Sequence, residues 1–539
     1  MITITPQGQV YLCKTPLEND YKNQLTFANA NSQLTYFNST IQKTFDNYTY
    51  IKKDNVIKVG CNIDEIIDCN YLFYRNTGFT NKIYYCFITN MIYINENCTA
   101  ITFETDCFQT WLFQLQPKKC FVEREHVNDD SVGLHTIPEN VEMGEPIVQY
   151  VSDLEPSNYY VVIAVSEDIL RNDETTYHHK YNGVVSGLTY IALQSSIDVN
   201  YFIFRYNTAG KSGAISSLFM VPEEYVVPLV WATDSTGLIH YKYISERNTP
   251  FELGSIDIRK PSILGEGDEG YTPKNKKLLT FPYCYILADN NAGANVVYRY
   301  EDFTAPEGTP ANYCRFSAIG TINAGCSIKY VPINYKNIDK NYNESFNGAK
   351  LPLGGWINDV YVNWLRQNGL NIAINTAGSV LQIVGGIGLA GTGAGGVSGA
   401  GQIASGITGI ASTIGQIYQH SLIPNQAEGN VNSSDIMFSA GKSGASIYQM
   451  SIKIEYLKVI DEFFSMFGYK VNEVKVPNLY GRANWNYVKT IDCNFEGNIP
   501  QVDLNIIKTM FNKGVTLWHS PSTMYNYDAN NDIVWIGRW

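Results

Sequence analysis

One stretch of this chain, residues 367–427, contains no charged side chain. Arg366 precedes it, Glu428 follows it, and fourteen of its 61 residues are glycine. The chain as a whole is 17% charged, so random placement would almost never leave so long a gap. Two apolar arms, Leu370–Leu389 and Ile403–Ile423, are joined by a flexible glycine-rich run. Each arm has about the 20 residues that a helix needs to cross a bilayer.

Neither arm has the composition of a resident transmembrane helix. Glycines interrupt both arms, and each glycine costs a helix interior about 1 kcal/mol relative to alanine. No cluster of Lys and Arg and no belt of Trp and Tyr marks the ends of the arms. Two interpretations stay open: a Gly/Ala-rich buried core or flexible linker, or a segment that is protected in one state and meets lipid in another.

The residues that would enter a membrane are the larger aliphatic side chains of the two arms and their link. They are Leu370, Ile372, Ile374, Val380, Leu381, Ile383, Val384, Ile387, Leu389, Val397, Ile403, Ile407, Ile410, Ile414, Ile417, Leu422 and Ile423.

The composition of the whole chain favours a structural protein with large interfaces. A chain of 539 residues can hold three or four domains with sizeable cores. Low charge together with 39 tyrosines indicates extensive strand surface and contacts between subunits. The net charge of −12 argues against binding of nucleic acid through basic patches, although DNA could slide past such a surface without sticking.

The N-terminus and the cysteines point to synthesis in a cytoplasm. Residues Met1 to Pro6 have neither the basic nor the apolar region of a signal peptide. The eleven cysteines form no C-x-x-C pair. We therefore expect reduced thiols.

Residue patterns predict strands through most of the chain. Alternating apolar and polar residues predict a strand at Lys82–Thr89 and another from Ile101 to Phe108. A helical turn or two is expected at Ile63–Asn70. In the middle of the chain, turn residues separate six further expected strands: Tyr159–Val165, Tyr201–Tyr206, Leu218–Met220, Val226–Trp231, Tyr283–Ala288 and Val296–Tyr300.

Three helices are expected near and after the uncharged stretch. The first, Trp356–Leu370, leads into it. The second, Ser446–Phe467, has apolar residues at helical spacing and Gly468 where a C-terminal cap belongs. The third is capped by Asp503 and ends at Gly514.

Glycine-rich and lysine-containing motifs do not predict a nucleotide site. Gly386–Gly391 and Gly391–Gly396 match the dinucleotide fingerprint, but no acidic residue follows before Glu428 to hold a ribose. Gly210-Lys-Ser and Gly441-Lys-Ser lack the opening glycine of a phosphate-binding loop. We expect no cofactor and interpret both Gly-Lys-Ser sites as turns.

Neither a metal site nor a catalytic site is predicted. His178-His179 has no partner at ligand spacing, so an exposed loop is expected there. The charged run Glu123–Asp130 contains Glu123, Glu125 and Asp129, which could serve acid–base chemistry. No nucleophile accompanies them, and such runs are usually solvated or lie at interfaces. The sequence does not read as an enzyme.

Several sequence segments outside the uncharged stretch resemble those of one viral protein family. They are Thr105–Phe113, Phe121–Asp130, His135–Asn140 with Gly144-Glu145, Tyr469, Pro477-Asn478, Arg482, Trp485–Thr490, Cys493-Asn494, Gly497–Pro500 and Thr516–His519. Together they resemble the tail knob (distal tail tube) proteins of small short-tailed bacteriophages, the podoviruses of the Salas-virus type (Picovirinae). The likeness covers roughly residues 45–150 and 350–520, while the middle is too generic to match.

The resemblance implies a mainly β fold with a few helices, assembled as a hexameric tube. Four parts follow: residues 1–150 as the N-terminal part of a β-rich tube domain, 151–350 as a mainly β knob insertion, 351–445 as a helix plus a long apolar plug loop, and 446–539 as the C-terminal part of the tube domain.

The resemblance also implies a function in genome ejection. Apolar loops from six subunits would plug the tube of the virion tail, then exit and form a pore in the bacterial cytoplasmic membrane. Implied partners are the other subunits, the lower collar, a peptidoglycan-degrading tail-tip protein, appendages, and viral DNA that passes without specific binding. The alternative is a receptor-binding or purely structural tail component whose loops only seal the tube.

Overall fold

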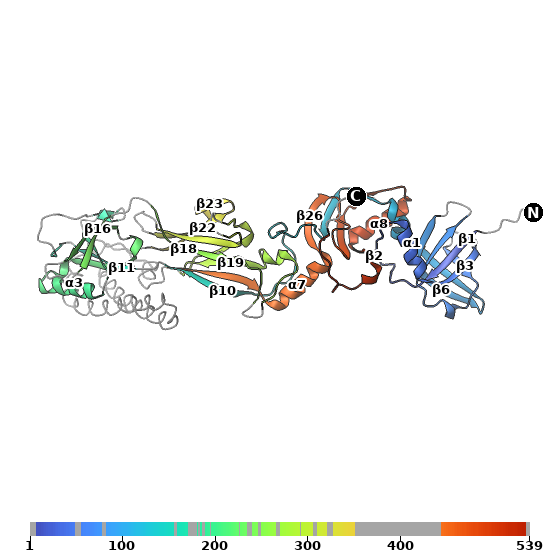
Figure 1. Ribbon diagram of the computed structural model, residues 1–539, viewed down its shortest axis with the longest axis horizontal. Helices are drawn as coiled ribbons and strands as arrows, with labels where there is room; N and C mark the ends of the chain where they lie inside the picture. Colours follow the sequence, from blue (N-terminus) through green and yellow to red (C-terminus); the bar gives the residue numbers. More distant parts are fainter. Residues whose placement is uncertain are drawn as a thin grey trace, which may run out of the picture. The chain divides into compact units, whose positions relative to one another are not determined.

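The computed structural model describes residues 7–350, with short interruptions, and residues 444–534. The interruptions are 49–54, 78–81, 156–158, 166, 171–179, 182–183, 186–188, 195, 226, 234–239, 246–249, 266–269, 292, 306–309 and 321–326. The described part is mainly β structure with a few helices, which confirms the predicted fold class (Figure 1).

The chain divides into two compact units, and each combines distant parts of the sequence. Unit 1 contains Met1–Met143, Thr272–Leu278 and Ile454–Trp539, and unit 2 contains Gly144–Tyr271 and Leu279–Lys453. The division into four consecutive parts stays a prediction, because the proposed plug loop lies outside the described residues.

Unit 1 is built on two sheets. The first has the order β3-β1-β5-β6-β7-β4, with β1 Gly8–Cys13, β3 Ile41–Tyr48, β4 Val56–Val59, β5 Tyr71–Asn76, β6 Ile83–Asn95 and β7 Cys98–Thr105. The second has the order β2-β29-β27-β9-β26, with β2 Asn23–Leu25, β9 Cys120–Glu125, β26 Tyr469–Lys475, β27 Trp485–Ile491 and β29 Val515–Trp518. A small pair joins β8 Gln116–Pro117 to β28 Phe495–Glu496. The second sheet therefore joins the two ends of the chain.

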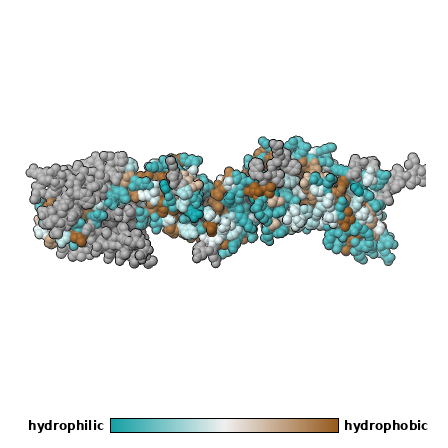
Figure 2. All heavy atoms as spheres, viewed as in Figure 1, coloured by the Kyte–Doolittle hydropathy of each residue, from teal (hydrophilic) through white to brown (hydrophobic). Residues whose placement is uncertain are grey.

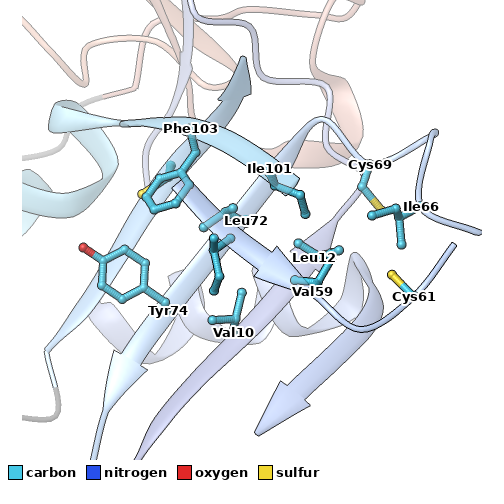
Figure 3. Close-up of a cluster of buried hydrophobic side chains, with 12 residues drawn as sticks. Val10, Leu12, Val59, Cys61, Ile66, Cys69, Leu72, Tyr74, Ile101 and Phe103 are labelled. Carbon is cyan, nitrogen blue, oxygen red and sulfur yellow. The ribbon is translucent and has the colours of Figure 1, made fainter. Parts of the chain in front are cut away.

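Side chains of the first sheet alternate between two apolar clusters. Along β5, Leu72 and Tyr74 belong to the cluster drawn in Figure 3, together with Val10, Leu12 and residues of β4 and β7. Tyr71 and Phe73 belong to the opposite cluster, which includes Trp485 and Trp518. This alternation is the period of two that strand geometry imposes. The first four residues of β5, Tyr71 to Tyr74, are aromatic or aliphatic and buried, because clusters cover both faces of the strand there. On the face drawn in Figure 2, polar residues predominate over the β1–β7 region, and hydrophobic residues form small groups.

Four helices lie in the described part of unit 1: α1 Ala30–Ser39, α2 Cys107–Trp111, α7 Ile454–Phe467 and α8 Gln501–Lys513. The strand predicted from Ile101 to Phe108 was wrong at its end, because β7 stops at Thr105. Asp106 caps α2: its carboxylate accepts hydrogen bonds from the Gln109 N–H (3.1 Å) and from the Tyr71 hydroxyl (2.9 Å). Asp106 is fully buried, and this burial raises its pKa to about 7.

The predicted C-terminal helices were partly correct. Gly468 (φ 63°) and Gly514 (φ 94°) end α7 and α8 in the left-handed region that favours glycine. The helix predicted from Ser446 was wrong in its first part, which belongs to strand β25, Ala445–Ile452. Asp503 is not the cap of α8, because Pro500 stands there; its carboxylate instead accepts a hydrogen bond from Trp111 Nε1 (2.8 Å). The helical turn expected at residues 63–70 is present as a short 3-10 helix.

Unit 2 contains three main sheets. One has the order β10-β25-β19-β20, with β10 Pro146–Leu154, β19 Cys284–Asp289, β20 Asn295–Tyr298 and β25 Ala445–Ile452. Another has the order β15-β11-β14-β17-β16, with β11 Tyr159–Val165, β14 Thr189–Leu193, β15 Ile215–Pro222, β16 Val227–Thr233 and β17 His240–Ser245. The third contains β18 Phe251–Arg259, β21 Tyr313–Gly320, β22 Ser327–Tyr335, β23 Ile338–Lys340 and β24 Phe346–Lys350. A short pair joins β12 Lys180–Tyr181 to β13 Val184–Val185.

Most strands predicted for this unit are confirmed, but one is wrong. Tyr201–Tyr206 lies in helix α3, Ser196–Thr208, where Val199, Phe202, Ile203 and Tyr206 are buried at helical spacing. The strand predicted to end at Tyr300 ends at Tyr298.

Candidate functional site

The residues predicted to plug the tube or enter a membrane all lie outside the described residues, as does the helix expected at 356–370. The described strands that flank this region are β24, which ends at Lys350, and β25, which begins at Ala445. The functional site that the structure can describe is therefore the region where the chain leaves β24 before residue 351 and enters β25 after residue 443.

The chain segments on either side of residues 351–443 are hydrogen-bonded to two consecutive residues of one turn. The turn joins β19 to β20 and contains Asn290 and Asn291. Asn290 Nδ2 donates a hydrogen bond to the Asn347 carbonyl (2.6 Å), on β24. Asn291 Nδ2 donates to the Gly444 carbonyl (3.2 Å), directly before β25, and also lies 3.2 Å from Ser446 Oγ. We call these five residues the stem.

The turn itself is held in place by hydrogen bonds of its own. Asn290 and Ala294 exchange two bonds: Asn290 N–H donates to the Ala294 carbonyl, and Ala294 N–H donates to Asn290 Oδ1 (both 3.0 Å). Asn291 has φ 54°, a left-handed conformation that asparagine tolerates well, and its N–H donates to Asp289 Oδ1 (2.7 Å). Both amide side chains are therefore oriented by the fold before they contact the stem carbonyls.

Packing next to the stem places each departing strand. On β24, Phe346 is buried and stacks on Tyr330 of β22, with ring centroids 5.0 Å apart. A Cβ atom on Gly348 would lie 2.7 Å from the Tyr330 ring, so close packing there requires glycine. On β25, Ser446 Oγ donates to Asp153 Oδ1 of β10 (2.7 Å).

The start of β25 is confined in the same way. A Cβ atom on Gly444 would lie 2.3 Å from Glu155 Cγ and 3.1 Å from the Leu154 carbonyl oxygen, so a larger residue would require the Glu155 side chain or the backbone to move. Ser446 stands opposite Asp153 on one side and Asp289 on the other. The stem therefore connects all three strands, β10, β25 and β19, around the point where the chain returns from residue 443.

The sequence did not reveal the stem. The segment from Asp289 to Asn295 is rich in Asn, Gly and Ala, which indicates a turn between the two predicted strands. Which carbonyls its amides would meet depends on strand pairing between residues more than 150 positions apart. Residues that favour a turn do not indicate which distant backbone carbonyls the turn's asparagine side chains will bind.

In the charged run Glu123–Asp130, the three carboxylates singled out from the sequence have separate partners. Glu123 pairs with Lys489 (2.9 Å), and Asp129 accepts hydrogen bonds from the Ser131 N–H and hydroxyl. Glu125 is fully buried beside Lys475 (2.5 Å), and burial raises its pKa. Each of these carboxylates has its own structural partner, and the three are not brought together.

A buried ionic network connects this run to two other parts of unit 1. The Glu139 carboxylate pairs with Arg124 of β9 and with Lys277 (2.6 Å), and it accepts a hydrogen bond from the Lys470 N–H (2.8 Å). The Glu139 and Lys277 side chains are 1% and 2% exposed. Burial lowers the pKa of Lys277, against the effect of Glu139.

The segment that carries Lys277 is fixed by a second buried carboxylate. Asp461 of α7 accepts hydrogen bonds from the N–H groups of Lys274 (2.7 Å) and Asn275 (3.0 Å), and from the Asn275 side chain (2.8 Å). Residues Thr272–Leu278 are therefore bound to unit 1 mainly through carboxylates.

Two further features concern metal and membrane binding. Among the described ranges, no group of three or more His, Cys, Asp or Glu is placed to hold a metal ion. In that same part of the chain, no helix combines the length and the hydropathy needed to span a membrane.

Comparisons with known proteins give consistent matches. Residues 241–532 match the family model described as Bacillus phage phi29, Tail knob protein gp9, C-terminal domain. Residues 8–116 match the model described as Caudoviral major tail protein N-terminus. The chain is 27% identical to the tail knob protein gp9 of Bacillus phage B103, over 96% of this chain and 97% of that protein. It is 25% identical to the tail knob protein gp9 of Bacillus phage phi29, over 97% and 98%.

Among solved structures, the bacteriophage C1 tail knob protein gp12 shares the fold. Its TM-score is 0.61 at 14% identity, and the match covers 98% of this chain and 100% of that one. The relatives align over nearly the whole sequence, including residues 150–350, where the sequence motifs alone showed no resemblance.

Proposed function

Because this chain belongs to the family of the Bacillus phage phi29 tail knob protein gp9, we propose that it forms a hexameric distal tube whose uncharged loops first close the channel and then open the host membrane. The chain is a structural component of a podovirus tail, as its relatives are. The finer steps are closure by Leu370–Ile423, exit of these loops, and formation of a pore in the bacterial cytoplasmic membrane.

The observation that carries the proposal is the stem. Asn290 and Asn291 donate hydrogen bonds to the carbonyls of Asn347 and Gly444, so the described chain on either side of residues 351–443 is attached to one turn of a β-rich unit. Residues 351–443 can therefore change their surroundings while the strands on either side keep their pairing. A segment whose two flanking strands stay paired can act as a plug that moves while the surrounding β structure remains folded.

The physical chemistry of the uncharged stretch supports two apolar environments. Six loops bring twelve apolar arms together, and each buried CH₂ group is worth about 0.8 kcal/mol. Inside a tube the arms would cover one another, and outside it lipid is the apolar environment that remains. Glycines at 378, 385, 406 and 409 would permit close packing between helices in lipid.

The test is dye leakage from liposomes. Deletion of Ile372–Tyr418 is expected to leave an assembled ring in sedimentation while it abolishes leakage. Val384→Asp and Ile407→Asp are expected to act alike, since a charge at bilayer depth costs about 3 kcal/mol per copy. The matched control is Ile338→Asp, which places the same charge on an exposed residue of β23 and should leave leakage unchanged.

Two outcomes would contradict parts of the proposal. If the intact protein leaks no liposome at any pH or lipid composition, the pore is excluded and the loops only seal the tube. If the deletion prevents folding or ring assembly, the uncharged stretch is a buried core.

A further inference from the structure

Unit 1 has a groove of about 930 Å³ that none of the steps proposed above uses. One wall is a face of helix α8, and the segment Asn19–Asn23 with Phe467, Tyr487 and Tyr527 forms the rest. Aromatic and aliphatic side chains make up much of this lining, with amide side chains between them.

Helix α8 has apolar residues on two faces. The side chains on its core face are Leu504, Ile507, Met510 and Phe511, which are buried in one apolar cluster. Val502 and Ile506 line the groove one helical turn apart, and they are 72% and 39% exposed. A helix that is apolar on more than one face is normally covered on each of them. Within the described ranges, the groove face of α8 is left uncovered.

The hairpin of β6 and β7 ends in a second uncovered apolar surface. β5 pairs with β6 only as far as Phe87, so from Asn90 to Asn95 β6 pairs with β7 alone. We call residues 91–97 the hairpin tip. Its side chains Ile92, Tyr93 and Ile94 are 52%, 52% and 43% exposed. Exposed apolar residues on a strand with a free edge favour association with another chain.

Charges of opposite sign lie beside the two surfaces. Glu96 is exposed in the hairpin tip, and Lys513 is exposed at the end of α8, where it lines the groove. Among the described residues, neither forms an ion pair, whereas the other lysine of the groove, Lys22, pairs with Asp20 (3.0 Å). The tip therefore matches the groove in charge as well as in apolar character.

We propose that the groove of one subunit holds the hairpin tip of a second copy of the chain. Ile92, Tyr93 and Ile94 then pack against the groove face of α8, and Glu96 lies beside Lys513. The inference rests on the ring of the proposed function and names the contact that closes it.

A ring of identical chains requires two different, complementary surfaces on each chain, because its contacts run head to tail. The tip and the groove meet this requirement. Met91 of the tip packs against the cluster on one face of the first sheet, the face drawn in Figure 3. Tyr21 of the groove packs against the opposite cluster, which contains Tyr71. The two surfaces adjoin different faces of this sheet, so one chain can contact two neighbours at once.

Mixing two defective variants of the full chain tests the proposal. Tyr93→Asp in the tip and Ile506→Asp in the groove should each raise the concentration of half-assembly at least about tenfold, because the contact would bury an unpaired charge. In a mixture, the intact tip of the Ile506→Asp chain fits the intact groove of the Tyr93→Asp chain. Sedimentation should then show pairs with one copy of each variant and no ring.

Val474→Asp is the matched control, since it places the same charge on a residue of β26 that is 64% exposed. This variant should assemble like the parent, and near-ultraviolet circular dichroism confirms that each variant is folded. A milder pair of changes exchanges the charges. Glu96→Lys and Lys513→Glu should each weaken assembly, and the two together should restore it.

Rings formed by Tyr93→Asp or Ile506→Asp at the parent's concentration would overturn the contact, and the groove would then bind a different protein or none. A mixture that stays as single chains, or a charge exchange without recovery, would also overturn it while the parent's ring still stands. A parent that forms no ring would instead overturn the proposed hexamer and this contact together.

Discussion

Two regions of this protein hold distant chain segments side by side, and they use different chemistry. In unit 1, the almost fully buried Glu139 carboxylate binds Arg124, Lys277 and the Lys470 N–H. In unit 2, Asn290 and Asn291 hold the stem through neutral amide hydrogen bonds. Removing one partner of a buried ionic network leaves an uncompensated charge, whereas a neutral hydrogen bond is worth about 1 kcal/mol. Separating the segments that Glu139 joins in unit 1 is therefore expected to cost more free energy than breaking one amide hydrogen bond of the stem.

The largest expected effect is on the buried network. Glu139→Gln should lower the unfolding free energy of unit 1 by about 3–5 kcal/mol, because Arg124 and Lys277 lose the charge that compensates them. Denaturant unfolding followed by the fluorescence of the buried Trp485 and Trp518 measures it. Asp68→Asn, in the exposed pair with Lys14 of the same unit, is the control and should change stability by less than about 1 kcal/mol. Equal effects of the two variants would remove the basis of the comparison.

The free energy of unfolding of unit 1 should depend on pH through two buried ionisable groups, Asp106 and His126. Asp106 has a folded pKa of about 7, above its ordinary value of 3.8. Its contribution to stability is fully present below the ordinary value and is lost as the pH rises through about 7. His126 has the opposite sign: burial lowers its pKa to about 3, so its contribution is present above 6.5 and is lost as the pH falls.

Asp106→Asn separates these two effects. The His126 contribution is common to both proteins, so the difference in stability between them isolates Asp106: it should fall by about 1.4 kcal/mol per pH unit between about pH 4 and 7 and level off above that. Urea unfolding at a series of pH values measures it. Asp129→Asn is the control, because the pKa of this exposed carboxyl is lowered and its contribution changes only in acid. An unchanged slope in Asp106→Asn would show that this carboxyl is already ionised in the folded protein.

The smallest expected effect is at the stem. Asn290→Ala and Asn291→Gly should each cost about 1 kcal/mol, and glycine keeps the left-handed turn at 291 available. We expect faster hydrogen exchange in β24 and at the start of β25, with the rest of unit 2 unchanged. Asn295→Ala, an exposed residue of the same hairpin, should have no such effect. A loss as large as that of Glu139→Gln would mean that the stem is not the weaker of the two regions.

Local patterns in the sequence were sufficient for several elements. The strand at Tyr159–Val165 and the helix ends at Gly468 and Gly514 follow from apolar runs and from glycine at positive φ. Tyr201–Tyr206 was misassigned because a short aromatic run fits a strand or a buried helix equally well, and only its packing selects the helix.

The stretch from Ala445 to Ile452 shows the same limit in the opposite direction. Its spacing fits a helix, but the strand lies between β10 and β19, so its ladder partners begin near residues 146 and 284. Strand pairing between such distant residues satisfies the backbone of β25 on both sides and overrides the local pattern.

By itself, the sequence determined that residues 367–427 are uncharged and that a mainly β chain surrounds them, because composition and periodicity are local properties. The tail-protein type followed from a resemblance to known sequences, not from these local properties. The stem and the Glu139 network were decided only by the tertiary structure. An amide or a carboxylate takes its role from the groups placed against it, and here those groups are as far as 331 residues away in the chain.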